Sequence, residues 1–149
     1  LLEPEIIEAL YEASRAGVEI SLIVRGVCAL RPGLPGLSAT IRVRSVIGRF
    51  LEHSRIFYFL NGGAEDVYLS SADWMDRNFF RRIEICFPVL DPKLKRRVIR
   101  EGLIAYLKDN SQPWEMSGDG QYHQKNPRRA KTPSAQQTLL LELSAKAAK

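Results

Sequence analysis

The sequence predicts a mixed α/β fold in which helices flank a sheet. Three observations predict it: residues 3–16 and residues 91–108 have the apolar periodicity of helices, and residues 41–46 alternate as a strand does. The chain has 149 residues, of which 45% are hydrophobic and 26% charged. This length and composition are typical of one globular domain, and they exclude a wholly disordered, collagenous or membrane-spanning chain.

The first helix is predicted over residues 3–16, because Pro4 suits a first turn and Gly17 supplies a stop. Residues 18–24 then begin as an alternating pattern and end as an apolar run, which is typical of a strand entering a covered sheet. A helix, a glycine and a buried strand form the second half of a βαβ unit. We therefore expect a further strand before Leu1, and we expect the chain to be a piece of a longer protein.

The middle of the chain is predicted to be rich in strands. Residues 41–46 form a strand with one basic face, and residues 55–60 and 66–70 form two more, joined by the turn Asn61-Gly62-Gly63. Residues 82–89 are a fourth strand of this part.

The C-terminal third is predicted to hold a long helix and a tail. Asp91 and Pro92 are a cap and a first-turn residue for the helix that ends near residue 108. Residues 111–133 are rich in Gln, Pro, Gly, Ser and Lys and are expected to be mobile. A last amphipathic helix after Ser134 has no evident core partner, so we expect it to dock outside this chain. The organisation is thus a domain over residues 1–109 and a flexible tail over residues 110–149.

Positive charge is concentrated in one part of the chain. The formal net charge is +5, and residues 22–58 alone contribute +5 because they hold six arginines, no lysine and one glutamate. A guanidinium stays charged when desolvated and contacts two phosphate oxygens at once, so this block favours a phosphate-rich partner. Nucleic acid, nucleotide, polyphosphate and acidic lipid remain open, as does the alternative that the arginines are only solvated strand faces.

Cys28 and Cys86 are the two cysteines, too few for a disulfide framework or a zinc site. We expect two buried thiols in a reducing, cytoplasmic protein, and association with the inner face of the membrane is left open.

Two residues are the strongest candidates for chemistry. His53 lies just before a predicted strand and is flanked by Arg49 and Arg55, whereas His123 lies in the polar tail. Arg25 follows the buried strand, and Gly26 next to it permits close approach of a ligand. Residues 68–78 place hydroxyl, carboxylate and amide groups directly after another strand, where α/β sheets bind ligands.

Together these strings resemble the C-terminal domain of bacterial polyphosphate kinases of the phospholipase-D-like type. The resemblance covers about residues 2–109, and it rests on several uncommon strings in the same order and at the same spacing. They are Ile23-Val24-Arg25-Gly26-Val27-Cys28, Phe50-Leu51-Glu52-His53-Ser54-Arg55, Asn61-Gly62-Gly63 and Tyr68-Leu69-Ser70-Ser71-Ala72-Asp73-Trp74-Met75-Asp76-Arg77-Asn78.

The resemblance implies a phospholipase-D-like mixed sheet flanked by helices. It also implies a phosphotransferase that moves the γ-phosphate of ATP reversibly onto polyphosphate through a phosphohistidine outside this chain. Arg25 of this chain matches an arginine that contacts the nucleotide in that family. His53 matches the family's second active-site histidine, which also binds ATP. The phosphohistidine, the residues for Mg²⁺ and an adenine-stacking tyrosine belong to preceding domains, so the isolated chain is expected to be inactive.

The resemblance also implies binding partners. They are ATP, ADP, inorganic polyphosphate, the preceding domains and, at full length, further copies of the enzyme; nucleic acid is not among them.

A more distant resemblance, to phospholipase-D-like phosphodiesterases, raises the alternative that the chain is a phosphodiesterase or nuclease. Their H-x-K-x4-D signature is His53-Ser54-Arg55 here, with Leu60 in the place of the aspartate. The missing lysine and aspartate disfavour a phosphodiesterase or nuclease. A non-catalytic module that binds polyanions or nucleic acid remains the second alternative.

Overall fold

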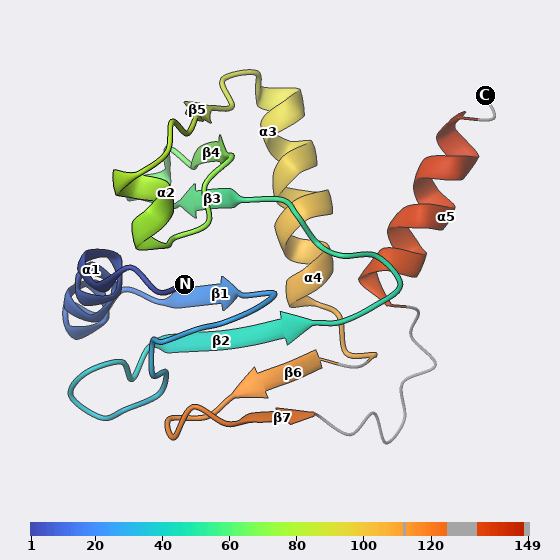
Figure 1. Cartoon of the computed structure of the whole chain (residues 1–149). Helices are drawn as coiled ribbons and strands as arrows, with labels where there is room; N and C mark the ends of the chain where they lie inside the picture. Colours follow the sequence, from blue (N-terminus) through green and yellow to red (C-terminus); the bar gives the residue numbers. More distant parts are fainter. Residues whose placement is uncertain (112, 125–133, 148–149) are drawn as a thin grey trace.

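The computed structural model describes residues 1–111, 113–124 and 134–147. The strands in these ranges form two separate sheets with helices around them (Figure 1). The predicted mixed α/β class is confirmed, but the division of the strands into two sheets is a feature that the periodicity did not predict. None of the described helices is both long and apolar enough to cross a membrane.

The larger sheet is mixed and holds the main core. In the order β1-β2-β6-β7, its strands are β1 (Ile20–Ile23), β2 (Ile41–Val46), β6 (Pro113–Met116) and β7 (Tyr122–Gln124). β1 is parallel to β2, and the remaining pairs are antiparallel. Ile41 and Val43 are 1% and 2% exposed while Arg42 between them is exposed, so the predicted alternation of β2 is confirmed.

The helix α1 (Pro4–Arg15) packs on this sheet through Ile7, Leu10 and Tyr11, which contact a core cluster that includes Leu30. Glu3 caps its first turn by accepting a hydrogen bond from the Glu5 N–H at 3.3 Å. The helix stops where Gly17 adopts a φ of +87°.

The smaller sheet is antiparallel, in the order β3-β4-β5. Its strands are β3 (Ile56–Phe59), β4 (Asp66–Ser70) and β5 (Cys86–Pro88), and the short helix α2 (Asp76–Phe80) lies between β4 and β5 in the chain. The predicted turn is the 3₁₀ segment η1 (Asn61–Gly63), in which Gly62 and Gly63 have φ angles of 62° and 99°. The predicted strand 82–89 is shorter than expected, because only Cys86–Pro88 lies opposite β4. Cys28 is half-buried and Cys86 is exposed, so the expectation of two buried thiols was wrong for Cys86.

The long helix predicted after Asp91 consists of α3 (Pro92–Val98), the π-helical segment η2 (Ile99–Ile104) and α4 (Ala105–Leu107). The Asp91 carboxylate accepts hydrogen bonds from the Lys93 and Leu94 N–H groups, both at 2.8 Å, and so confirms the predicted cap. Gly102 in η2 faces Ile56 so closely that a β-carbon would overlap the isoleucine side chain. The helix and the small sheet therefore pack closely at Gly102, where a larger residue would have to displace the end of the Ile56 side chain.

The expectation that residues 111–133 are mobile was wrong for the strands β6 and β7. β6 pairs with β2, placing Glu115 opposite Arg44, and Pro113 and Met116 are buried. Strands of four and three residues show no measurable alternation, and Gly118 and Gly120 between them resembled a loop. The domain therefore continues past residue 109; residues 125–133 lie outside the described ranges.

The helix predicted after Ser134 is α5 (Ala135–Ala147), and the expectation that it docks outside this chain was wrong for its first turn. Ala135 and Gln136 are only 4% and 6% exposed on this domain, whereas Leu140 and Leu141 are 48% and 66% exposed. Polar contacts rather than a leucine stripe hold the helix, which is why its apolar pattern did not predict the docking. Figure 1 shows the later turns of α5 standing apart from the sheets.

Arg44 has a structural role that its place in the arginine block did not predict. Its Nη1 donates to the carbonyls of Tyr106 at 3.2 Å and Leu107 at 2.5 Å, where α4 ends, and its Nη2 lies 3.2 Å from Glu115 Oε1. Arg44 thus caps a helix C-terminus and joins it to the large sheet. Arg44 therefore makes structural contacts within the domain, although it belongs to the arginine-rich part of the chain.

Replacing Arg44 by methionine is expected to lower the free energy of unfolding by about 1–3 kcal/mol, because the carbonyls that end α4 lose a charged donor. Urea denaturation followed by circular dichroism measures this change. Arg42→Met is the matched control, because Arg42 is exposed on the same strand, and it is expected to change stability by less than about 0.5 kcal/mol. Equal stabilities for the two variants would contradict the capping role.

Candidate functional site

A polar cavity of about 340 Å³ lies where the chain leaves β1 and β4 and enters β3. The segments around it come from both sheets and from α2. The lining residues are Arg25, His53, Arg55, Ser71, Asp73, Arg77, Asn78, Arg82 and Glu84.

Asp73 is the hub of the cavity. Its carboxylate accepts hydrogen bonds from Arg55 Nε and Nη2, both at 3.0 Å, and from Arg25 Nη2 at 3.1 Å. The hydrogen bonds from Arg55 are the main reason that the pKa of Asp73 is lowered, and the charge of Arg25 adds to them. Asn78 fixes the backbone at the same place, because its Nδ2 donates to the Asp73 carbonyl at 2.9 Å. One carboxylate therefore sets the positions of two guanidinium groups.

Arg25 reaches this hub from the end of β1. Besides contacting Asp73, it donates from Nη1 to the Glu52 carbonyl at 2.9 Å. Arg25 thus ties the end of β1 to the segment just before His53. A guanidinium has more N–H donors than these contacts use, which leaves Arg25 able to bind an anion.

His53 is exposed at the cavity and is held by Arg55. Arg55 Nη1 lies 2.8 Å from His53 Nδ1 and also donates to the His53 carbonyl at 2.8 Å. Because a guanidinium can only donate, Nδ1 must be the acceptor, and the proton of the neutral ring is on Nε2. The geometry therefore makes His53 a hydrogen-bond donor through Nε2.

Ser71 and two residues that precede β5, Arg82 and Glu84, also line the cavity. The Ser71 hydroxyl donates to Glu84 Oε2 and accepts the Ile85 N–H at 3.0 Å. Glu84 Oε1 also lies 3.7 Å from Arg82 Nε. These contacts join the end of β4 to the segment that enters β5.

The cavity has an excess of positive charge. Arg25, Arg55, Arg77 and Arg82 line it together with two carboxylates, Asp73 and Glu84, which leaves a formal charge of +2 before His53 is counted. An open, arginine-rich cavity with a histidine donor is suited to bind an anion with several oxygen atoms, such as the end of a phosphate chain.

The family comparison agrees with this chemistry. The family model described as polyphosphate kinase C-terminal domain 2 matches residues 1–137. This chain belongs to that family.

Curated members of the polyphosphate kinase family are close in sequence. The polyphosphate kinase of Burkholderia cenocepacia is 67% identical over 125 residues, which is 84% of this chain and 18% of the relative. That of Paraburkholderia phytofirmans is 61% identical over 140 residues, 94% of this chain and 20% of the relative. The chain thus spans about a fifth of the length of these curated relatives.

A solved polyphosphate kinase has the same fold. The crystal structure of the enzyme from Porphyromonas gingivalis matches with a TM-score of 0.90 and 44% identity, over 98% of this chain and 22% of that chain. The predicted resemblance to the C-terminal domain of polyphosphate kinases and the phospholipase-D-like mixed α/β fold are both confirmed.

Within this polyphosphate kinase domain, Arg25 and His53 line one cavity although they are far apart in sequence. Asp73 and Arg55 connect them, since Asp73 holds both arginines and Arg55 holds His53. His123 lies instead in β7, where its Nε2 is 3.1 Å from the Ser117 hydroxyl, and it is not among the residues that line the cavity. The roles of Arg25 and His53 in the reaction stay predictions.

Sequence reasoning did not select Asp73, Arg55, Arg77 and Arg82 as site residues. Asp73 could have been predicted as a site residue, because it follows a strand inside the string Ser70-Ser71-Ala72-Asp73. Arg55 stands two residues after His53, where the related phosphodiesterases have lysine, and this position was also informative. No periodicity marked Arg77 or Arg82, which lie in α2 and just beyond it.

The cavity does not fit the Mg²⁺ that the family resemblance implies. Asp73 is engaged by two arginines and Glu84 by Ser71, so neither carboxylate is directed at an ion. In the described part of the chain, no cluster of three or more His, Cys, Asp or Glu side chains has the arrangement of a metal site.

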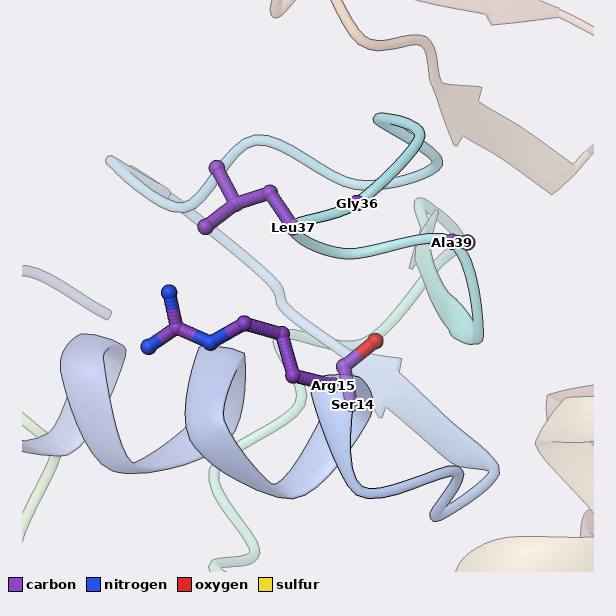
Figure 2. Close-up of a pocket in the computed structure, with 5 residues that line it drawn as sticks. All are labelled: Ser14, Arg15, Gly36, Leu37 and Ala39. Atoms are coloured by element: carbon purple, nitrogen blue, oxygen red, sulfur yellow. The ribbon is translucent and has the colours of Figure 1, made fainter.

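A second hollow, of about 210 Å³, lies between the end of α1 and residues 36–39 (Figure 2). Arg15 and Ser14 border it from α1 and Leu37 from the facing loop, and the Ser14 hydroxyl is already hydrogen-bonded to the Thr40 hydroxyl at 2.8 Å. It shares no residue with the cavity around His53. Its one charged side chain, Arg15, is exposed, so the hollow does not have the polar groups of a phosphate site.

Proposed function

We propose that this chain forms the part of a polyphosphate kinase that binds the terminal phosphates of ATP and polyphosphate during reversible transfer of the γ-phosphate. The observation that carries the proposal is the cavity in which Asp73 orients two arginines beside a histidine donor. Phosphoryl transfer depends mainly on positioning and on neutralising the charge of the phosphoryl oxygens, and such a cavity supplies both.

Arg25 is proposed to bind phosphate oxygens of the nucleotide. Its guanidinium is held from one side by Asp73 and from another by the Glu52 carbonyl, so little rotamer freedom is left to lose when a phosphate binds. Preorganised donors of this kind stabilise charge without rearranging during the reaction.

His53 is proposed to donate a hydrogen bond from Nε2 to a phosphoryl oxygen in the transition state. Arg55 occupies Nδ1, so the ring presents one nitrogen to the cavity as a donor. A neutral imidazole in this tautomer suits general-acid or hydrogen-bond assistance, whereas the covalent step belongs to another histidine.

The other parts of the reaction are proposed to lie outside this chain. They are the phosphohistidine, the residues that hold Mg²⁺, and the preceding domains of a cytoplasmic, homo-oligomeric enzyme. ADP is the second product of the forward reaction. This division is consistent with the chain spanning only about a fifth of its relatives.

The isolated chain is expected to bind polyphosphate weakly but not to lengthen it, because binding groups are present and the phosphohistidine is absent. Fluorescence titration with polyphosphate at several salt concentrations measures binding, which is expected to weaken as salt rises. Arg25→Ala is expected to weaken it about tenfold, the equivalent of one charge-assisted contact. Arg15→Ala, a change at the exposed end of α1, is the matched control. Phosphorylation or chain elongation by the isolated chain would contradict the proposal.

The decisive experiment uses a full-length enzyme. In the chimera, this chain replaces the matching part of the Burkholderia cenocepacia polyphosphate kinase, to which it is 67% identical over the aligned 125 residues. The chimera is expected to make polyphosphate from ATP, and Arg25→Ala is expected to abolish most of this activity. A folded chimera without synthesis, or full activity in the Arg25→Ala variant, would overturn the proposal. Cleavage of a generic phosphodiester that depends on His53 would favour the phosphodiesterase alternative instead.

A further inference from the structure

We propose that the first turn of α5 is a latch that positions His53, with Gln136 as the positioning residue. This proposal rests on the proposed function, because it assigns to the C-terminal helix the task of holding the loop that carries the candidate active-site histidine. The His53 loop is defined here as residues 47–55, between β2 and β3.

Gln136 binds the backbone of the His53 loop in both directions. The Phe50 N–H donates to Gln136 Oε1 at 2.9 Å, and Gln136 Nε2 donates to the Phe50 carbonyl at 2.7 Å. The same Nε2 also donates to Glu52 Oε1 at 2.5 Å. Gln136 is 6% exposed, so water competes little for these bonds.

The latch is itself anchored to the body of the domain. Asp109, 4% exposed and just beyond α4, accepts the Ala135 N–H at 2.7 Å through Oδ2. Its Oδ1 accepts from the N–H and the hydroxyl of Ser111, at 2.8 and 2.6 Å. The start of α5 is therefore fixed relative to the helix that packs beside β3, and Gln136 is fixed with it.

Glu52, one of the residues that Gln136 contacts, stands immediately before the candidate active-site histidine. Glu52 is bound on three sides: by Gln136, by the Tyr106 hydroxyl at 2.8 Å and, through its carbonyl, by Arg25 Nη1 at 2.9 Å. Burial, together with this contact to Glu52, raises the pKa of Tyr106, so its hydroxyl stays a donor across the physiological range. His53 directly follows Glu52 in the chain.

Apolar packing does little to hold the His53 loop. Ile47, Phe50 and Leu51 are 65%, 49% and 80% exposed. A loop that buries so little apolar surface opens easily unless polar contacts hold it. The hydrogen bonds from Gln136, Tyr106 and Arg25 thus hold the residues just before His53, while Arg55 contacts His53 itself.

Gly48 supplies an independent observation on the latch. A β-carbon at Gly48 would overlap the Gln136 side-chain amide, and the φ of Gly48 is not among the positive ones, so alanine is strained there only by this contact. The loop therefore carries glycine at the point where Gln136 passes it. Gly48→Ala displaces the amide without changing α5.

The first test measures amide hydrogen exchange by NMR in this chain. In Gln136→Ala and Gly48→Ala, exchange of the Phe50 N–H is expected to become about 10-fold faster or more, the equivalent of one lost hydrogen bond. Leu141→Ala, at a position in a later turn of α5 that is 66% exposed, is the control and is expected to leave this rate unchanged. Thermal melting of each variant shows that the domain remains folded. An unchanged Phe50 rate in both test variants would overturn the latch.

The second test measures synthesis by the chimera. Gln136→Ala is expected to lower kcat by about 10- to 100-fold with little change in KM for ATP, because a displaced His53 affects the transition state more than nucleotide binding. Full kcat in Gln136→Ala, when His53→Ala is inactive, would overturn the positioning role and leave the proposed function standing. Full kcat in both variants would overturn the proposed function, and the positioning role with it.

Discussion

In the chimera, His53→Ala is expected to lower the rate of polyphosphate synthesis by about 10²- to 10⁴-fold, the usual contribution of a positioned proton donor. The expected reason is the tautomer, because Arg55 Nη1 donates to Nδ1 at 2.8 Å and Nε2 then carries the proton that we propose is donated to a phosphoryl oxygen. Alanine removes this donor and leaves the arginine–carboxylate hub in place.

Two further variants make this result specific. His53→Gln retains an N–H donor and is expected to keep more activity than His53→Ala. His123→Ala removes the other histidine of this chain, which is exposed in β7, and is expected to retain full activity. Initial rates of polyphosphate formation from ATP measure all three. A rate for His53→Ala equal to that of the unsubstituted chimera would remove His53 from the site.

Asp73→Ala is expected to have the second large effect, on both activity and stability. Without the carboxylate, Arg25 and Arg55 are left close together with no shared counter-charge, and Arg55 loses the contacts that orient it toward His53. We expect a loss of about 10²-fold in kcat from misplaced groups. We also expect a loss of about 1–3 kcal/mol in the free energy of unfolding.

The matched control for Asp73→Ala is Glu8→Ala, which removes a carboxylate from an exposed ion pair with Arg15 at 3.8 Å. Its effect on stability is expected to stay below about 0.5 kcal/mol. Urea denaturation at neutral pH measures both changes, and the chimera measures turnover. Asp73→Ala with normal turnover would show that the two arginines need no common carboxylate.

The stability effect of Asp73 is expected to depend on pH in a defined direction. Hydrogen bonds from Arg55 lower the pKa of Asp73 in the folded domain. A lowered folded-state pKa stabilises the fold at pH values above the ordinary aspartate pKa of about 3.9, and this contribution is lost as the pH falls through the lowered value. The difference in unfolding free energy between the unsubstituted chain and Asp73→Ala should therefore shrink steadily below about pH 4.

Much of the fold was predictable because its signals are local. The cap at Asp91, the stop at Gly17 and the alternation in residues 41–46 each reflect neighbours within a few positions, and all were confirmed. Arg25 and His53 were selected as candidates because they stand close to strands, in strings that resemble those of the family. Such features depend on backbone preference and on periodicity, which a sequence displays directly.

The remaining features depend on side chains that are distant in the chain. β6 and β7 are too short to show a period, and they are strands because β2 offers β6 a free edge. Asp73 meets Arg25 across 48 positions, and Gln136 meets Phe50 across 86.

The sequence by itself thus determined the α/β class, the main elements, the family and two candidate site residues. The tertiary structure decided that Asp73 and Arg55 orient those two residues, and that α5, expected to dock elsewhere, returns to hold the His53 loop. The physical reason is that a hydrogen bond between distant side chains leaves no periodic trace in the sequence, since it arises only when the packed elements bring donor and acceptor within about 3 Å.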